Sequence, residues 1–115
     1  MVEKDLAVKI FRLRVGETIA QDDLIERLQS LNYHEEKVVE EPGQFTVRGA
    51  AIDIYPLSYR APIRIHFRLN AIESIRDYSL HEGKSLTTFE ELFLLPVTGA
   101  FLKRRVRLKA QLEEF

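Results

Sequence analysis

The sequence contains no cysteine, so disulfide bonds, thiolate zinc sites and a cysteine nucleophile are excluded. It also lacks any apolar stretch near the roughly 20 residues that a membrane-spanning helix needs. The first residues lack the hydrophobic region of a signal peptide. The formal net charge of -1 shows no positive excess, which argues against a general nucleic-acid binder. We therefore expect a soluble intracellular protein with no membrane partner.

The 115 residues are enough for one domain with a buried core, since 45% of them are apolar and 30% are charged. Their periodicity predicts a strand, a helix, several further strands and a last helix. The predicted fold class is α+β, with a largely antiparallel sheet, an N-terminal helix packed on it and a C-terminal helix. The expected strands cover residues 7–15, 37–40, 45–47, 50–55, 63–69, 72–78 and 89–95.

Both helices are predicted from spacing and charge. Residues 18–21 have the spacing of a capping box, with the alternative that the cap lies one or two residues later. Asn32 suits the other end of the first helix. The last helix is expected over 101–115, where cations near its start oppose the helix dipole, so it either needs a partner or forms a frayed tail. The first helix rests on apolar residues at helical spacing, namely Leu24, Ile25, Leu28 and Leu31.

Two tight turns are indicated by residues that tolerate unusual backbone angles. Pro42 and Gly43 fit the centre of a type II turn, because proline presets one angle and glycine accepts a positive φ. Asn70 is expected to form the turn between two alternating strands, since asparagine tolerates left-handed geometry. Residues 79–86 are expected to form a loop.

The stretch "FTVRGAAIDIYP" places polar residues inside an otherwise apolar run. If Phe45 faces the core, Arg48 faces out, and Asp53 faces out only after a one-residue shift of strand phase. Gly49 is the expected place for that shift, as a bulge or a bend. We expect both polar residues to leave the core and Arg48 to lie near the polar face of strand 63–69. The alternative is that Arg48 and Asp53 pair with each other or cap a turn.

No arrangement of residues points to catalysis. Gly83-Lys84-Ser85 resembles the end of a phosphate-binding loop, but the first glycine of that motif and its strand-to-helix context are missing. The three histidines have no other ligand type at metal-site spacing. No serine lies in a Gly-x-Ser-x-Gly elbow. We therefore expect no enzyme activity, no cofactor and no metal.

A polar face is predicted along residues 63–69, where Arg64, His66 and Arg68 alternate with apolar residues. Such a face is either solvated or binds a partner. An alternative function, a nucleic-acid contact module, would use Arg64, Arg68 and the basic last helix. The basic residues of that helix are Lys103, Arg104, Arg105, Arg107 and Lys109.

The combined motif "EPGQFTVRGAAIDIYP", "APIRIHF" and "IESIRDY" resembles the UvrB-interaction domain family. This family includes domain 2 of the excision-repair protein UvrB and the equivalent domain of the bacterial transcription-repair coupling factor, Mfd, which is the more similar. The resemblance covers roughly residues 8 to 97. The matching residues are Glu41, Gly43, Phe45, Arg48, Gly49, Ile52, Asp53, Ile54, Tyr55, Pro56, Pro62, Arg64, Ile65, Phe67, Ile72, Glu73, Ser74, Ile75 and Arg76.

The resemblance implies a non-catalytic module that docks onto UvrA, the damage-recognition ATPase. Arg68 stands where the family has a phenylalanine, and Leu69-Asn70-Ala71 stand where it has Gly-Asp-Glu. The implied partner-binding residues are Arg48, Arg64, Arg68 and Arg76, and the implied structural residues are Gly43, Gly49 and Asp53.

The resemblance also implies how the chain relates to a longer protein. Residues 1–97 would form the UvrA-interaction domain, and residues 98–115 a helical tail that links back to a parent. That parent would be an ATP-dependent DNA translocase of the bacterial cytoplasm, whose other domains bind RNA polymerase, double-stranded DNA and ATP. The expected role is to recruit nucleotide excision repair to stalled RNA polymerase.

Overall fold

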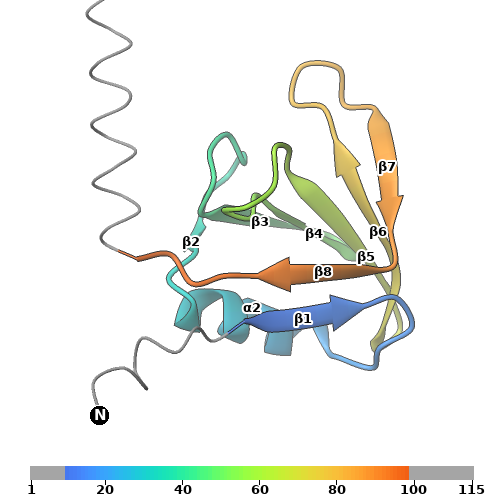
Figure 1. The fold of residues 1–115 in the computed structure, drawn as a ribbon. Helices are drawn as coiled ribbons and strands as arrows, with labels where there is room; N and C mark the ends of the chain where they lie inside the picture. Colours follow the sequence, from blue (N-terminus) through green and yellow to red (C-terminus); the bar gives the residue numbers. More distant parts are fainter. Residues whose placement is uncertain (1–9, 99–115) are drawn as a thin grey trace, which may run out of the picture.

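A computed structural model describes residues 10–98 of the chain (Figure 1). Within that range it contains one helix and eight strands in two sheets, so the domain consists mostly of sheet. The expected helix over 101–115 lies outside the described residues. The elements are β1 (Phe11–Arg14), α2 (Gln21–Ser30), β2 (His34–Glu35), β3 (Gln44–Arg48), β4 (Ala51–Ile54), β5 (Ile63–Arg68), β6 (Ala71–Tyr78), β7 (Ser85–Phe89) and β8 (Glu91–Leu94).

The larger sheet has six strands in the order β2-β3-β4-β5-β6-β7, which is also their order along the chain. All of its pairs are antiparallel except β2–β3, which is parallel. Consecutive antiparallel strands need only short connections, and the loops β3–β4 and β5–β6 have two residues each. The prediction of a largely antiparallel sheet is therefore confirmed.

The core lies on one face of this sheet, because the paired apolar residues of neighbouring strands share that face. Ile52, Ile65 and Ile75 occupy one row across β4, β5 and β6, and all three are fully buried. From α2, Leu24 and Leu28 join the same core cluster. Burying each of these side chains stabilises the fold by about 1.5–3 kcal/mol relative to leaving it in water.

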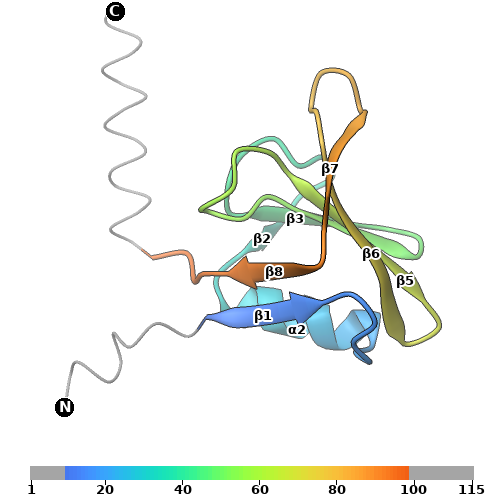
Figure 2. The ribbon, with the colours of Figure 1, turned by 45° about the vertical axis from the view of Figure 1, so that its right-hand side comes forward.

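The first and last described strands form a separate two-stranded sheet, in which β1 pairs with β8 (Figure 2). Leu13 and Leu92 are register partners, and both are fully buried in the same core cluster. The outward neighbours of Leu13 are Arg12 and Arg14, which lie 3.9 Å and 3.7 Å from Glu91. Beside Leu92, the outward side also carries the apolar Phe93, which is 41% exposed. This small sheet therefore covers the core with its apolar side.

The helix has its N-cap two residues after Thr18, within the range that the sequence left open. Ala20 is its N-cap, and no side chain caps this end. Thr18 instead forms an isolated bridge with Ala71. The residue that the spacing indicated as the cap therefore pairs with a distant strand. At the other end Asn32 has φ 68° directly after the C-cap Leu31, the left-handed position expected for asparagine.

Two strand predictions are wrong. Residues 37–40 form no strand, and the short β2 lies just before them at His34–Glu35. Two apolar valines suggested a strand there, but Val38 is 61% exposed and only Val39 is buried. Residues 79–86 were expected to form one loop, but β7 begins at Ser85 and pairs with β6. The composition of β7 is mostly polar, so the sequence pattern did not predict a strand there.

Two hairpin loops also differ in detail from the expectation. Gly49 has φ 58° and is the first residue of the two-residue β3–β4 loop, so it makes a turn rather than a bulge. In the β5–β6 loop, Leu69 has φ 58°, whereas Asn70 is not left-handed. Gly43 has φ 94° directly before β3, in agreement with the predicted turn.

Candidate functional site

The face of the six-stranded sheet opposite the core carries a group of polar residues, and we call it the outer face. Its members come from β3, β4, β5 and β6, because directly paired residues project to the same side. One row runs Thr46, Asp53, Arg64 and Arg76, and the next runs Arg48, Ala51, His66 and Ser74. Arg48 therefore lies on the same face as His66 of β5, with β4 between their two strands.

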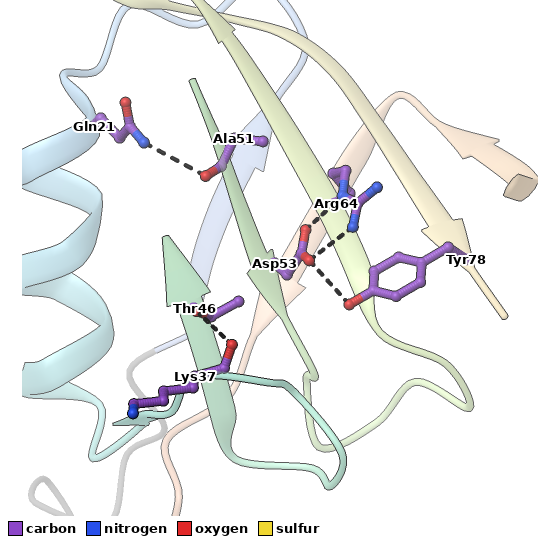
Figure 3. A network of polar contacts seen from close by, with 7 residues as sticks. All are labelled: Gln21, Lys37, Thr46, Ala51, Asp53, Arg64 and Tyr78. Carbon is purple, nitrogen blue, oxygen red and sulfur yellow. Dashed lines mark hydrogen bonds and ion pairs between the residues drawn. The ribbon is translucent and has the colours of Figure 1, made fainter. Parts of the chain in front are cut away.

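At the centre of the outer face, Asp53 forms a bidentate ion pair with Arg64 (Figure 3). Arg64 Nε donates to Asp53 Oδ1 at 2.7 Å, and a terminal guanidinium nitrogen donates to Oδ2 at 2.9 Å. The Tyr78 hydroxyl donates a third hydrogen bond to Oδ2 at 3.1 Å. This carboxylate therefore has partners on two neighbouring elements.

Asp53 leaves the apolar core, as predicted from the sequence, but it does not reach solvent. It points away from the isoleucine side, and its side chain is 1% exposed, against 30% for Arg64. Charged donors replace water around the carboxylate, which is the condition under which a protein buries an ionised group. The alternative pairing of Asp53 with Arg48 is also not observed, since Arg64 takes that place.

Electrostatic interactions couple the ionisation of Asp53, Arg64 and Tyr78. Hydrogen bonds to Asp53 raise the pKa of the Arg64 guanidinium above its ordinary value, although burial acts in the opposite direction. Burial raises the pKa of Tyr78 to about 12, and the charge of Asp53 and the hydrogen bond to it act in the same direction. The Arg64 guanidinium also lies 4.6 Å from the centre of the Tyr78 ring.

The remaining arginines of the outer face are exposed. Arg48 ends β3, and Arg76 is the register partner of Arg64 on β6. Arg68 is 81% exposed and lies 3.7 Å from the half-exposed Glu73, a surface pair of small energetic value. The structure thus brings the four sequence-predicted arginines to one side of the sheet, but it ties Arg64 to the protein itself.

One end of the outer face is held by the segment between β1 and α2. Ile19 N–H donates to Asn70 O at 2.9 Å, and Gly16 N–H donates to Ile72 O at 2.8 Å. The Gln21 amide donates to Gly49 O at 2.7 Å. Because this segment bonds to the β5–β6 hairpin and Gln21, the first residue of α2, bonds to the β3–β4 loop, the ends of the two hairpins are fixed relative to each other.

Sequence reasoning missed Tyr78 as a member of the site. A signal was present, because Tyr78 follows Arg76 by two positions and a strand places such residues on one face. Thr46 was also not singled out, although it is buried and its hydroxyl donates to Lys37 O at 3.5 Å (Figure 3). Both residues complete the polar layer that surrounds Asp53.

Two other features are absent from residues 10–98. No group of three or more histidine, aspartate or glutamate side chains in that range is placed to hold a metal ion. No helix of that range is long and apolar enough to cross a bilayer.

Comparison with known proteins gives a consistent result. Residues 11–99 match the model of the UvrB interaction domain. The chain is 31% identical over 98 residues to a transcription-repair-coupling factor from Bacillus subtilis strain 168, covering 85% of this chain and 8% of that protein. It is 40% identical over 80 residues to the protein of that name from Staphylococcus haemolyticus, covering 70% and 7%. For Staphylococcus aureus strain MRSA252 the identity is 36% over 103 residues, covering 88% and 9%. The chain spans less than a tenth of the length of these relatives.

Proposed function

The chain belongs to the UvrB interaction domain family, and from this premise we propose that it docks onto UvrA through its outer face. The family is one of protein-interaction modules and links the chain to nucleotide excision repair. Docking would be non-catalytic and would join UvrA to whatever larger protein carries the domain. The observation that supports this most is the gathering of Arg48, Arg68 and Arg76 on one exposed sheet face.

The charge of this face defines the partner surface that it fits. Around Arg48 and Arg76 the buried carboxylate of Asp53 is already neutralised by Arg64. The exposed arginines therefore present a local positive charge, although the chain as a whole carries -1. A carboxylate-rich surface on UvrA would complement it, and complementary charge raises association rates and sets orientation. Arginine suits the task because its planar guanidinium pairs with carboxylates in a bidentate manner.

Arg64 would contribute in a different way from its neighbours. An arginine has five N–H donors, and the two hydrogen bonds to Asp53 use two of them. The side chain is still 30% exposed, so its remaining donors can reach a partner. Because Asp53 and Tyr78 fix the guanidinium, binding would cost little side-chain entropy at this position.

The relatives suggest the larger setting of the domain. All three reported relatives are named transcription-repair-coupling factors. We place this chain in such a parent, with the UvrA-binding domain ending near residue 97 and residues 98–115 leading back to it. Other domains of the parent would engage RNA polymerase, double-stranded DNA and ATP, and UvrA docking would bring excision repair to a stalled polymerase.

Calorimetric titration of the 115-residue chain with UvrA from the same organism tests this proposal. We expect Arg48→Glu and Arg76→Glu each to lower the affinity by about tenfold or more, because central interface arginines commonly contribute above 1.4 kcal/mol. Arg12→Glu is the matched control. Arg12 is an exposed arginine on β1, 53% accessible and away from the outer face, and its reversal should leave the affinity unchanged.

Unchanged affinity in both outer-face variants would contradict the proposal. A nucleic-acid function would instead show as affinity for a DNA duplex that falls steeply with salt concentration, because bound phosphates release counterions. UvrA docking through a few arginine–carboxylate pairs should weaken less over the same salt range. Titrations with UvrA and with a DNA duplex at two salt concentrations therefore separate the two functions.

A further inference from the structure

Leu69 is a large apolar residue that is almost fully exposed to solvent. It is 94% exposed, whereas two other exposed apolar residues, Val38 and Ile10, are 61% and 55% exposed. It is also one of two non-glycine residues in that range with positive φ, and the other is Asn32. A leucine at positive φ is a genuine outlier, because its Cβ crowds the backbone there.

The neighbouring hairpin provides an internal comparison. Both β3–β4 and β5–β6 have two-residue loops whose first residue has φ 58°. In β3–β4 that residue is Gly49, which adopts this angle without steric cost. In β5–β6 it is Leu69, although Asn70, a residue that tolerates the angle, lies next to it. Turn formation alone therefore does not account for leucine at this position.

Packing of the Leu69 side chain does not offset the cost of this conformation. A side chain that is 94% exposed buries almost no apolar surface, so Leu69 gains little from packing. A strained residue at a surface site is a reason to look for a function in binding. An exposed leucine held on a rigid turn is suited to enter an apolar pocket of a partner, because it is ordered before binding.

The surroundings of Leu69 connect it with the outer face. Arg68 precedes it and is 81% exposed. The β3–β4 loop lies beside it, because Phe67 N–H donates to Ala50 O at 2.8 Å. Arg48, the last residue of β3, is therefore at the same end of the sheet. Two exposed cations, Arg68 and Arg48, thus lie at the same end of the sheet as this apolar side chain.

We propose that Leu69 is the apolar anchor of the docking surface, entering an apolar pocket of UvrA whose rim carries carboxylates that pair with Arg48 and Arg68. This inference rests on the proposed function, UvrA docking, and names a residue that determines the affinity of that docking. Apolar anchors surrounded by polar contacts often supply much of the binding energy of an interface. Leucine occupies a loop position whose backbone angle favours glycine because its side chain contacts UvrA.

The test combines UvrA titration with thermal unfolding of the 115-residue chain. Leu69→Gly removes both the side chain and the strain, so it should weaken UvrA binding by about tenfold or more while Tm rises by about 4 °C. Leu69→Ala removes the side chain but keeps the strained backbone, so it should weaken binding with little change in Tm. Leu80→Ala is the control, because Leu80 is 43% exposed in the β6–β7 loop, at the opposite end of β6.

Three outcomes decide the matter. Weaker binding in both Leu69 variants, with Leu80→Ala unchanged, supports the anchor. Full binding by Leu69→Gly while wild type also binds overturns the anchor and leaves UvrA docking intact. If the wild-type chain does not bind UvrA at all, both the proposed function and the anchor are overturned.

Discussion

Asp53 shows how a charged residue is accommodated between two buried isoleucines. Its strand position turns it away from Ile52 and Ile54, yet its side chain is 1% exposed. The ion pair with Arg64 and the hydrogen bond from Tyr78 replace the water that it loses. Such a buried pair is costly to break from one side, since the remaining group is left without its partner.

We therefore predict that Asp53→Ala lowers the free energy of unfolding by about 2 kcal/mol, below the range for a fully buried pair because Arg64 keeps access to water. Urea denaturation followed by circular dichroism measures this. Glu73→Ala is the matched control, because it breaks the exposed pair with Arg68 and should cost no more than about 0.5 kcal/mol. Equal losses in the two variants would contradict the structural role of Asp53.

Individual strands show where the sequence predicted the fold and where it did not. The hairpin β5–β6 was predicted almost to its ends, because strict alternation of apolar and polar residues specifies both strand and face. The strand β7 was missed, since its residues are mostly polar and its pairing partner β6 determines its conformation. The short β2 carried no local signal either, because a two-residue strand is defined by its neighbour.

At this scale the conformation of Gly49 leads to a prediction. Gly49→Val should lower the free energy of unfolding by more than about 1 kcal/mol, because a β-branched residue is disfavoured at φ 58°. Space is not the reason, since a Cβ added at Gly49 would meet nothing within 4 Å. The measurement is the urea midpoint at constant slope.

Ala50→Val provides the control for that variant. Ala50 is the second residue of the same exposed loop and does not have positive φ, so valine there should change stability by less than about 0.5 kcal/mol. If both variants unfold at the same urea concentration as wild type, the turn does not depend on glycine at position 49.

For the whole molecule, the candidate site was partly predictable. Strand periodicity placed Arg64, His66 and Arg68 on one face, and family resemblance singled out Arg48 and Arg76. The ion pair at the centre was not predictable, because Asp53, Arg64 and Tyr78 come from three strands and their distances depend on register. The left-handed Leu69 also escaped prediction, since local preference assigned that geometry to Asn70.

Two tyrosines make the stability of the whole fold sensitive to alkaline pH. Burial raises the pKa of both Tyr33 and Tyr78 to about 12, whereas tyrosine in an unfolded chain titrates near pH 10. Above about pH 10 the unfolded chain loses protons that the folded chain retains. The free energy of unfolding should therefore fall as pH rises from about 10 to about 12.

Urea midpoints between about pH 9 and about pH 11.5 check this prediction. The double variant Tyr33→Phe and Tyr78→Phe lacks both titrating hydroxyls, so its midpoint should fall less over this range than that of wild type. Other groups that titrate in this range are common to the two proteins. If the two midpoints fall in parallel, the tyrosines do not carry the alkaline sensitivity.

The central claim is that the outer face of the six-stranded sheet, at the end where its hairpin loops lie, binds UvrA. Transferred cross-saturation from unlabelled UvrA to the deuterated, ¹⁵N-labelled chain tests it most directly. We expect saturation at the amides of residues 48–50 and 68–71 and at Arg76. Saturation confined to β1, β8 and α2, with the outer face unaffected, would contradict it.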